Sequence, residues 1–179
     1  MKTLSAISKP QASEHGAYFG LYVDQVPGEE VLAVLEEQVA EIESWSTRFA
    51  GERETFRYEP GKWSVRELIG HMNDTERVFM GRALWFARGD QKALPGFEQD
   101  EWSAVSNAGD VALEHLVQEA LVIRQSTLLF LRGLNADALE RSGKSENNQL
   151  SVRAAAWIVA GHLIHHSRVL SERYEVASS

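Results

Sequence analysis

Four long segments of the chain repeat their apolar residues every three or four positions. This spacing is that of one face of an α-helix, and no segment shows a convincing strand pattern. A helix with one apolar face must bury that face, and four such helices do so most simply by packing together. The sequence therefore predicts an all-α fold, a four-helix bundle, with helices over roughly residues 29–49, 64–88, 110–134 and 151–174.

Short motifs mark where three of these helices begin. Ser64 followed by Glu67 has the spacing of a capping box, and Ser151 precedes the fourth helix as an N-cap. Acidic residues from Glu29 onward suit the first turn of the first helix. The pattern divides the chain into an N-terminal arm (1–27), a metal-binding bundle (28–175) and a frayed tail (176–179), with a long connection at 89–109 and a polar loop at 135–149.

Composition excludes several classes of function. The chain has no cysteine, so disulfides, thiolate nucleophiles and thiolate metal sites are all excluded. Its net charge of -8 and the lack of a basic run argue against nucleic-acid binding. No apolar stretch is long enough to span a membrane, and the first residues lack the apolar core of a signal peptide. We expect a cytoplasmic protein without nucleic-acid or membrane partners.

Three histidines are the candidate metal ligands. His162 and His166 form an i, i+4 pair, which places two imidazoles one above the other on a helix face. At ~100° per residue they lie ~80° and ~40° from the centre of the apolar stripe, on one inward flank. His71 lies on the flank of the stripe in the second helix. His165 turns further toward solvent. His15, in the arm, and His115, early in the third helix, are expected at the surface.

Each candidate ligand has a plainer interpretation. An isolated pair at this spacing also occurs by chance, and a lone histidine at a helix boundary is commonly structural. Two imidazoles inside a bundle without a metal would, however, need buried hydrogen-bond partners. Asp74, three residues after His71, is a weaker candidate as a hydrogen-bond acceptor behind the ligands.

Two charged residues fall near the centres of apolar stripes. Glu76 lies there in the second helix and Arg124 in the third, and charges in a core must be paired or functional. One alternative is a buried ion pair between them. The other is a catalytic role near the metal, with Arg124 binding an anionic group and Glu76 acting as a general base. The long connection, with Phe97 and Trp102, either covers the site or packs over the end of the bundle.

Two separated motifs resemble those of the DinB-like, also called YfiT-like, superfamily. They are Gly61-Lys-Trp-Ser-Val-Arg-Glu-Leu-Ile-Gly-His-Met-Asn-Asp-Thr-Glu-Arg77 with Arg82-Ala-Leu, and Ser151-Val-Arg-Ala-Ala-Ala-Trp157 with Gly161-His-Leu-Ile-His-His166 and Glu172-Arg-Tyr174. The resemblance implies a four-helix bundle, often dimeric, with nickel or zinc held by three histidines. Those positions match His71, His162 and His166. Similar members include hydrolases, transferases that use bacillithiol or mycothiol, and a maleylpyruvate isomerase.

Three neutral protein ligands would leave a coordination position open, as in catalytic rather than structural metal sites. The sequence thus predicts a metal-dependent hydrolase, or a transferase that uses a low-molecular-weight thiol, acting on a small molecule as a homodimer. The alternatives are a non-catalytic, stress-related bundle that binds metal or ligand, and an interaction protein with an empty site.

Overall fold

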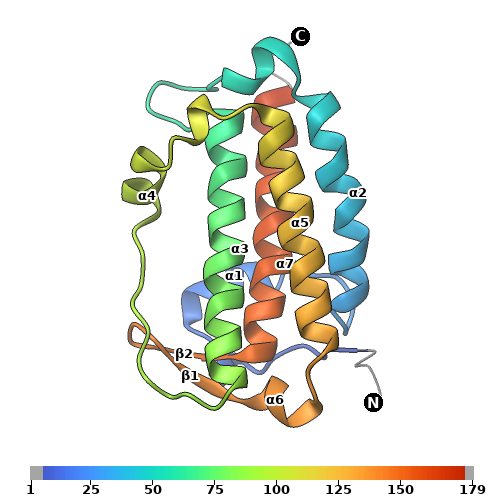
Figure 1. The fold of residues 1–179 in the computed structure, drawn as a ribbon, viewed down its shortest axis with the longest axis vertical. Coiled ribbons are helices and arrows are strands. Elements are labelled where there is room, and N and C mark those ends of the chain that lie inside the picture. Colours follow the sequence, from blue (N-terminus) through green and yellow to red (C-terminus); the bar gives the residue numbers. More distant parts are fainter. Residues whose placement is uncertain (1–5, 176–179) are drawn as a thin grey trace.

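In the computed structural model, which describes residues 6–175, four long helices lie side by side along the longest axis of the molecule (Figure 1). The predicted four-helix bundle is therefore confirmed. The predicted frayed tail, residues 176–179, lies outside the described residues. The four helices are α2 (Leu32–Arg48), α3 (Val65–Ala87), α5 (Leu113–Arg132) and α7 (Val152–Val169), which continues as a π-helical turn over Leu170–Glu175.

The order of helix directions explains the long connection. The colours of Figure 1 show α2 and α7 running in one direction and α3 and α5 in the other. Because α3 and α5 are parallel, the chain between them must return along the length of the bundle. This return carries a short helix that the sequence pattern did not predict, α4 (Gln99–Val105), and a 3-10 turn at Ala108–Asp110.

Both predicted serine caps are present. The Ser64 hydroxyl accepts a hydrogen bond from the backbone N–H of Glu67 at 3.3 Å, and the Glu67 carboxylate accepts one from the Ser64 N–H at 2.6 Å. The Ser151 hydroxyl accepts from the backbone N–H of Ala154 at 3.0 Å. These bonds satisfy N–H groups that have no partner within the helix, and they fix where α3 and α7 begin.

The first bundle helix begins later than predicted. We expected Glu29 to open it, but α2 starts at Leu32. The Glu30 carboxylate accepts hydrogen bonds from the backbone N–H groups of Leu32 and Ala33, at 3.2 and 2.7 Å. The acid therefore caps the helix from outside instead of lying in its first turn.

The polar loop predicted at 135–149 has regular structure. It contains α6 (Ala136–Glu140) and an antiparallel hairpin of β1 (Ser142–Ser145) and β2 (Asn148–Ser151). The strands have four residues each and little apolar alternation, so no strand pattern was visible. Packing stabilises them instead: Leu150 is buried, and Gly143 lies so close to Phe86 that an added Cβ would be 2.2 Å from its ring.

The N-terminal arm is packed against the bundle. Its described part forms 3-10 turns at Ala12–Glu14 and Ala17–Phe19 followed by α1 (Gly20–Val23), which lies against α7. Gly161 permits this contact, because a Cβ there would lie 2.0 Å from the carbonyl oxygen of Tyr22. Arg153 of α7 also binds Glu14 of the arm at 2.6 Å. The division into arm and bundle stays a prediction.

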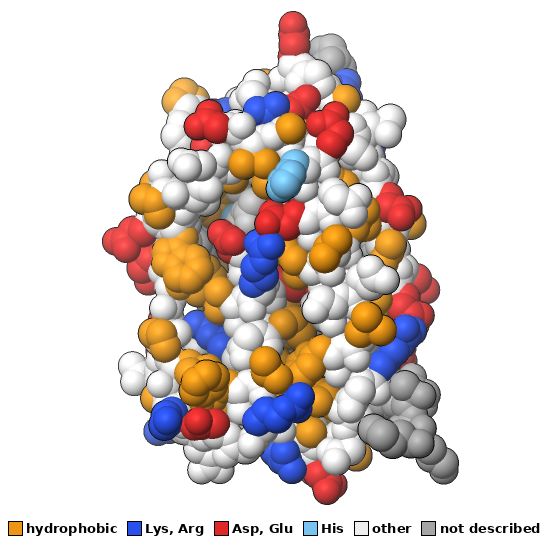
Figure 2. Space-filling model, viewed as in Figure 1, with side chains coloured by type: hydrophobic (Ala, Val, Ile, Leu, Met, Phe, Trp, Pro, Cys, Tyr) orange, Lys and Arg blue, Asp and Glu red, His pale blue; other side chains and the backbone are white. Residues whose placement is uncertain are grey.

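The buried core consists of two clusters. One lies toward the hairpin end and includes residues of the arm, and the other surrounds Trp45, Phe49 and Tyr174 at the opposite end. No helix within residues 6–175 has both the length and the apolar character needed to cross a bilayer. Large exposed hydrophobic side chains lie on several elements, and Figure 2 shows those of one face scattered among charged groups. The homodimer stays a prediction.

Candidate metal centre

The structure brings the three predicted histidines together. His71 projects from α3 toward α7, where His162 and His166 lie one helical turn apart. The Nε2 atom of His162 is 3.1 Å from the Nε2 atom of His71 and 3.1 Å from that of His166. One nitrogen from each ring lies within 4.8 Å of the others, a grouping that could hold a metal ion.

Hydrogen bonding alone does not account for this arrangement. A neutral imidazole nitrogen offers one in-plane site, either an N–H or a lone pair. The Nε2 atom of His162 can therefore make only one of its two short contacts as a hydrogen bond. Ligand nitrogens 2.0–2.1 Å from one ion are ~2.8–3.4 Å apart for octahedral to tetrahedral angles. The observed 3.1 Å separations fit a shared cation.

Burial keeps these rings uncharged. It lowers the pKa of His71 to about 4 and, together with the neighbouring histidines, the pKa of His166 to about 2. Burial and the adjacent rings also hold the pKa of His162 well below its usual value. Neutral imidazoles are the form that binds metal, so near neutral pH the three rings need lose no proton to act as ligands.

Aromatic side chains fix the orientation of the rings. The ring of Trp63 lies 4.7 Å from that of His71, and the ring of Tyr22 lies 5.2 Å from that of His162. The Nδ1 atom of His166 is buried and has no partner among the described residues. Asp74, the predicted acceptor, does not serve the ligands: it faces Arg77 at 3.8 Å and lines a separate cavity with Glu119.

The remaining histidines lie outside the triad. His165 is half-buried, with its ring 5.7 Å from that of Tyr22. His115 is exposed on α5, as expected. His15 is half-buried rather than exposed, because the arm packs against the bundle and the His15 Nδ1 atom lies 3.0 Å from the carbonyl oxygen of Gly16.

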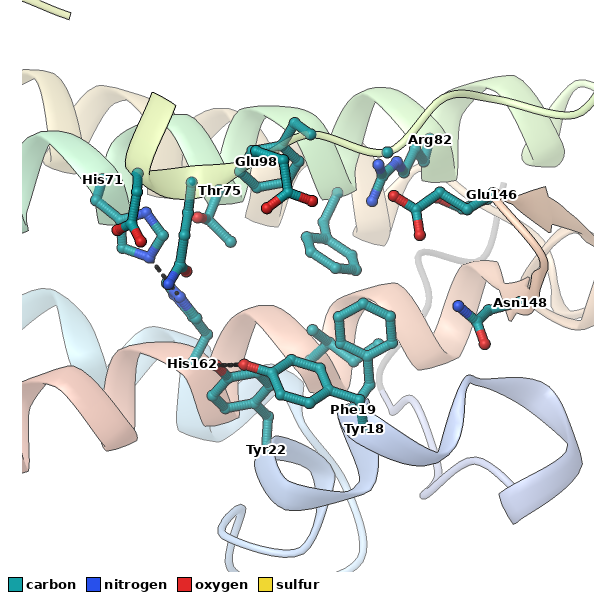
Figure 3. A pocket seen from close by; sticks show the side chains of 17 residues that line it. Tyr18, Phe19, Tyr22, His71, Thr75, Arg82, Glu98, Glu146, Asn148 and His162 are labelled. Atoms are coloured by element: carbon teal, nitrogen blue, oxygen red, sulfur yellow. Dashed lines mark hydrogen bonds between the residues drawn. The ribbon is translucent and has the colours of Figure 1, made fainter. Parts of the chain in front are cut away.

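Two large cavities reach the triad, each lined by different members of it. The first, of about 330 Å³, is lined by His71 and His162 at one end (Figure 3). The second, of about 570 Å³, is lined by His165 and His166. Two residues of α4 line both cavities, Gln99 and Asp100. The long connection therefore covers the site, as one of our two alternatives predicted.

The connection contributes acids and an aromatic ring to the first cavity. Phe97, Glu98 and Asp100 line it, whereas Trp102 is not among the lining residues and packs on Phe97, with ring centroids 4.9 Å apart. Burial lowers the pKa of His71, and the negative charge of Asp100 opposes this with a smaller effect.

Glu76 and Arg124 form a buried salt bridge. Arg124 is fully buried and donates two hydrogen bonds to the Glu76 carboxylate, at 3.0 and 2.8 Å. It also donates to Gln38 at 2.5 Å and to the carbonyl oxygen of Leu35 at 3.2 Å. Neither residue lines the 330 Å³ cavity; Glu76 lines, with His162, a cavity of only about 10 Å³. The hydrogen bonds between the two residues support the ion-pair alternative. A catalytic role for either residue stays a prediction.

Several residues of the first cavity were not among the predicted site residues. Thr75 and Arg82 on α3 line it, as does Tyr22 of the arm and Glu146 of the hairpin turn. The helical spacing could have identified Arg82, because eleven residues after His71 is close to three full turns. No periodic signal could have identified Tyr22 or Glu146, because they enter the site from connecting segments.

Comparison with known sequences finds proteins related to this chain. The sequence profile of the DinB superfamily matches residues 35–170. A protein of Geobacillus thermodenitrificans named "Putative metal-dependent hydrolase" is 30% identical over 74 residues, which are 40% of this chain and 42% of that protein. A protein of Oceanobacillus iheyensis, also named a putative metal-dependent hydrolase, is 22% identical over 150 residues, which are 79% of this chain and 86% of that protein. The chain thus aligns with less than half of the first relative and most of the second.

Two solved structures share the fold. YfiT from Bacillus subtilis, described as "a probable metal-dependent hydrolase with an unusual four-helix bundle topology", superposes with a TM-score of 0.74 at 16% identity and covers 95% of this chain and 93% of its own. A mycothiol-dependent maleylpyruvate isomerase superposes with a TM-score of 0.61 at 14% identity, over 82% of this chain and 61% of its own.

Proposed function

This chain belongs to the DinB superfamily, and we propose that it is a metal-dependent enzyme that acts on a small molecule. The proposed ligands are His71, His162 and His166. The convergence of their nitrogens carries the proposal, because two 3.1 Å contacts to one Nε2 atom suit a shared cation better than hydrogen bonds. The names of the two sequence relatives support it.

Three histidine ligands would leave room for a reacting molecule at the ion. When bound, a divalent metal at this site would supply Lewis-acid chemistry. The residues around it would orient the substrate. The Thr75 hydroxyl is buried, lines the cavity beside His71 and His162, and has no partner among the described residues. Because this oxygen is itself fully buried, Thr75 would shape this end of the cavity without bonding to the substrate, and the aromatic walls would exclude water.

Hydrolysis is the reaction that the names of the relatives favour. A thiol transferase is the second candidate, and the second cavity beside His166 favours it because two molecules could approach the triad through different cavities. The chain has no cysteine, so the transferred sulfur would come from a low-molecular-weight thiol. Nickel and zinc both suit three histidines.

Elemental analysis of the purified protein tests the centre. We expect about one equivalent of nickel or zinc in the wild type and its loss in His166→Ala. His165→Ala is the matched control, since it removes the adjacent imidazole but leaves the triad, and it should retain the metal. No metal in the wild type after loading with either ion would refute the centre.

Turnover is tested separately on the loaded protein. Ester and amide panels test hydrolysis, and electrophiles with added low-molecular-weight thiols test transfer. We expect turnover in one arm that His166→Ala abolishes and His165→Ala retains. Tightly bound metal without turnover in either arm would instead indicate a non-catalytic binding bundle.

A further inference from the structure

Arg82 is a buried cation without an ion-pair partner. Only 7% of the residue is exposed, and within residues 6–175 no acid forms a salt bridge with it. Among the described residues its hydrogen-bond partner is the carbonyl oxygen of Pro95, which accepts from Nη2 at 2.8 Å. A guanidinium has five N–H donors, so most of its hydrogen-bonding capacity remains available. A buried charge in this condition is costly unless a ligand compensates it.

Arg82 lies at the opposite end of the first cavity from the triad. Figure 3 shows His71 and His162 at one end and Arg82, Glu146 and Asn148 at the other. Arg82 follows His71 by about three turns of α3, which separates their Cα atoms by ~16 Å on one helix face. The cavity is therefore elongated, with the metal ligands at one end and a cation at the other.

Aromatic rings occupy the space between these ends. The guanidinium carbon of Arg82 is 5.3 Å from the ring centroid of Phe79 and 5.8 Å from that of Phe97. The rings of Phe79 and Phe19 meet edge to face, with centroids 5.3 Å apart. Such walls suit a flat apolar group. The volume of about 330 Å³ lies at the small end of ligand sites, which span roughly 300–1,000 Å³.

Glu146 is the nearest competitor for the guanidinium. It is exposed in the hairpin turn, and its charge opposes the effect of burial, which lowers the pKa of Arg82. A solvated carboxylate beyond salt-bridge reach compensates a buried cation poorly. A ligand carboxylate inside the cavity could instead form a bidentate pair with the guanidinium.

From this arrangement we infer that Arg82 is the anion-binding subsite for the substrate, which is a small monocarboxylate with a flat apolar body. The carboxylate binds Arg82, the body lies between Phe79 and Phe97, and a neutral reacting group faces the triad. Glu98 and Asp100 line the cavity as well and would repel a second negative charge. The placement of the reacting group at the triad rests on the proposed function. Binding of the carboxylate by Arg82 requires no metal.

Calorimetric titration with 3-phenylpropanoate and its uncharged primary amide tests the subsite. The protein is first used metal-free, with a chelator present, so that the carboxylate cannot bind an ion at the triad. We expect the carboxylate to bind about tenfold to hundredfold more tightly than the amide, the range for a charge-assisted hydrogen bond. Arg82→Met should abolish this preference while retaining amide binding, and Arg82→Lys should restore part of it.

Two further variants separate ligand binding from a structural role. Arg77→Met removes an exposed arginine of the same helix that pairs with Glu119 outside the cavity, and its carboxylate preference should equal that of the wild type. Glu146→Gln removes the competing charge and should leave the preference equal or greater. Equal affinities of wild type for acid and amide, no binding of either, or a preference that survives in Arg82→Met would each overturn the subsite.

Failure of the metal centre would look different. A wild type that takes up no nickel or zinc yet prefers the carboxylate through Arg82 would refute the proposed function and retain the subsite. Zinc bound by the triad without any carboxylate preference in the chelated protein would do the reverse.

Discussion

Breaking the buried pair of Glu76 and Arg124 is expected to destabilise the fold severely. Arg124→Met keeps much of the side-chain length and removes the charge. The substitution leaves the Glu76 carboxylate, which is 8% exposed, with a hydrogen bond from Thr127 at 2.7 Å but without its cation. Such an unpaired buried charge costs about 3–5 kcal/mol. The unfolding free energy of typical domains is about 5–15 kcal/mol, so this single change removes a large part of it.

A double-mutant cycle separates the pair from its surroundings. Glu76→Met leaves the Arg124 guanidinium unpaired and should cost about 3–5 kcal/mol as well. The double variant removes both charges, so its loss should fall short of the sum of the single losses by up to ~3 kcal/mol. Arg124→Lys keeps the charge but not the two-bond geometry and should lie between wild type and Arg124→Met.

Urea unfolding followed by far-ultraviolet circular dichroism measures these losses, with a chelator present so that bound metal does not contribute. Arg132→Met is the matched control on α5, because Arg132 pairs with Glu36 at the exposed surface and such pairs contribute about 0–1 kcal/mol. Losses below about 1 kcal/mol for both single variants, adding without coupling, would refute the structural role of the pair. Lost turnover with unchanged stability would support the catalytic alternative.

Three further outcomes follow from the structure. Gly161→Ala should destabilise the protein by about 1–3 kcal/mol in urea unfolding, because the added Cβ would collide with the backbone of Tyr22. Gly81→Ala is the control: a Cβ there meets nothing within 4 Å, so it should stabilise by up to about 1 kcal/mol. Equal effects of the two substitutions would contradict the close contact between Gly161 and Tyr22. Burial raises the pKa of Glu14, but the charge and hydrogen bonds of Arg153, together with hydrogen bonds from Gln11 and Ser151, hold it below its usual value. The stability that Glu14 contributes is therefore present above pH ~4.5 and is lost as pH falls. The thermal midpoint of Glu14→Gln should then depend less on pH between about 6 and 3 than that of the wild type, and an unchanged dependence would count against these interactions. A hundredfold excess of metal over its Kd stabilises by about 2.7 kcal/mol, so chelation should lower Tm by ~5–11 °C in the wild type and not in His162→Ala, and equal shifts would show that the metal binds elsewhere.

The sequence predicted the features that depend on regular helical spacing. The four long helices and the inward flanks of His71 and His162 follow from periodicity, because residues on one helix face recur at known intervals. The caps at Ser64 and Ser151 follow from short motifs, and the joining of the histidines in one site was implied by the family resemblance. The depth of burial of Arg124 followed from periodicity. Its partner could only be offered as one alternative, since periodicity shows which face a residue occupies and not which helix lies opposite.

The missed features lie where periodicity gives no information. The hairpin strands of four residues are held by tertiary contacts, with Gly143 packed on Phe86, and local sequence carries little of that. The parallel arrangement of α3 and α5 was also not predicted, although the long connection required it. Tyr22 and Glu146 reach the first cavity only because the arm and the hairpin fold back onto the bundle.

The origin of the cavity walls has a consequence for how such a protein can diversify. The spacing of His162 and His166 is set by the register of one long helix, and a change in length within α7 would destroy it. Tyr22, Phe97 and Glu146 come instead from three connecting segments, where insertions and deletions are tolerated more easily. Proteins that share this bundle can therefore change which small molecule they bind by remodelling the connections. The histidines of the bundle helices need not change when they do.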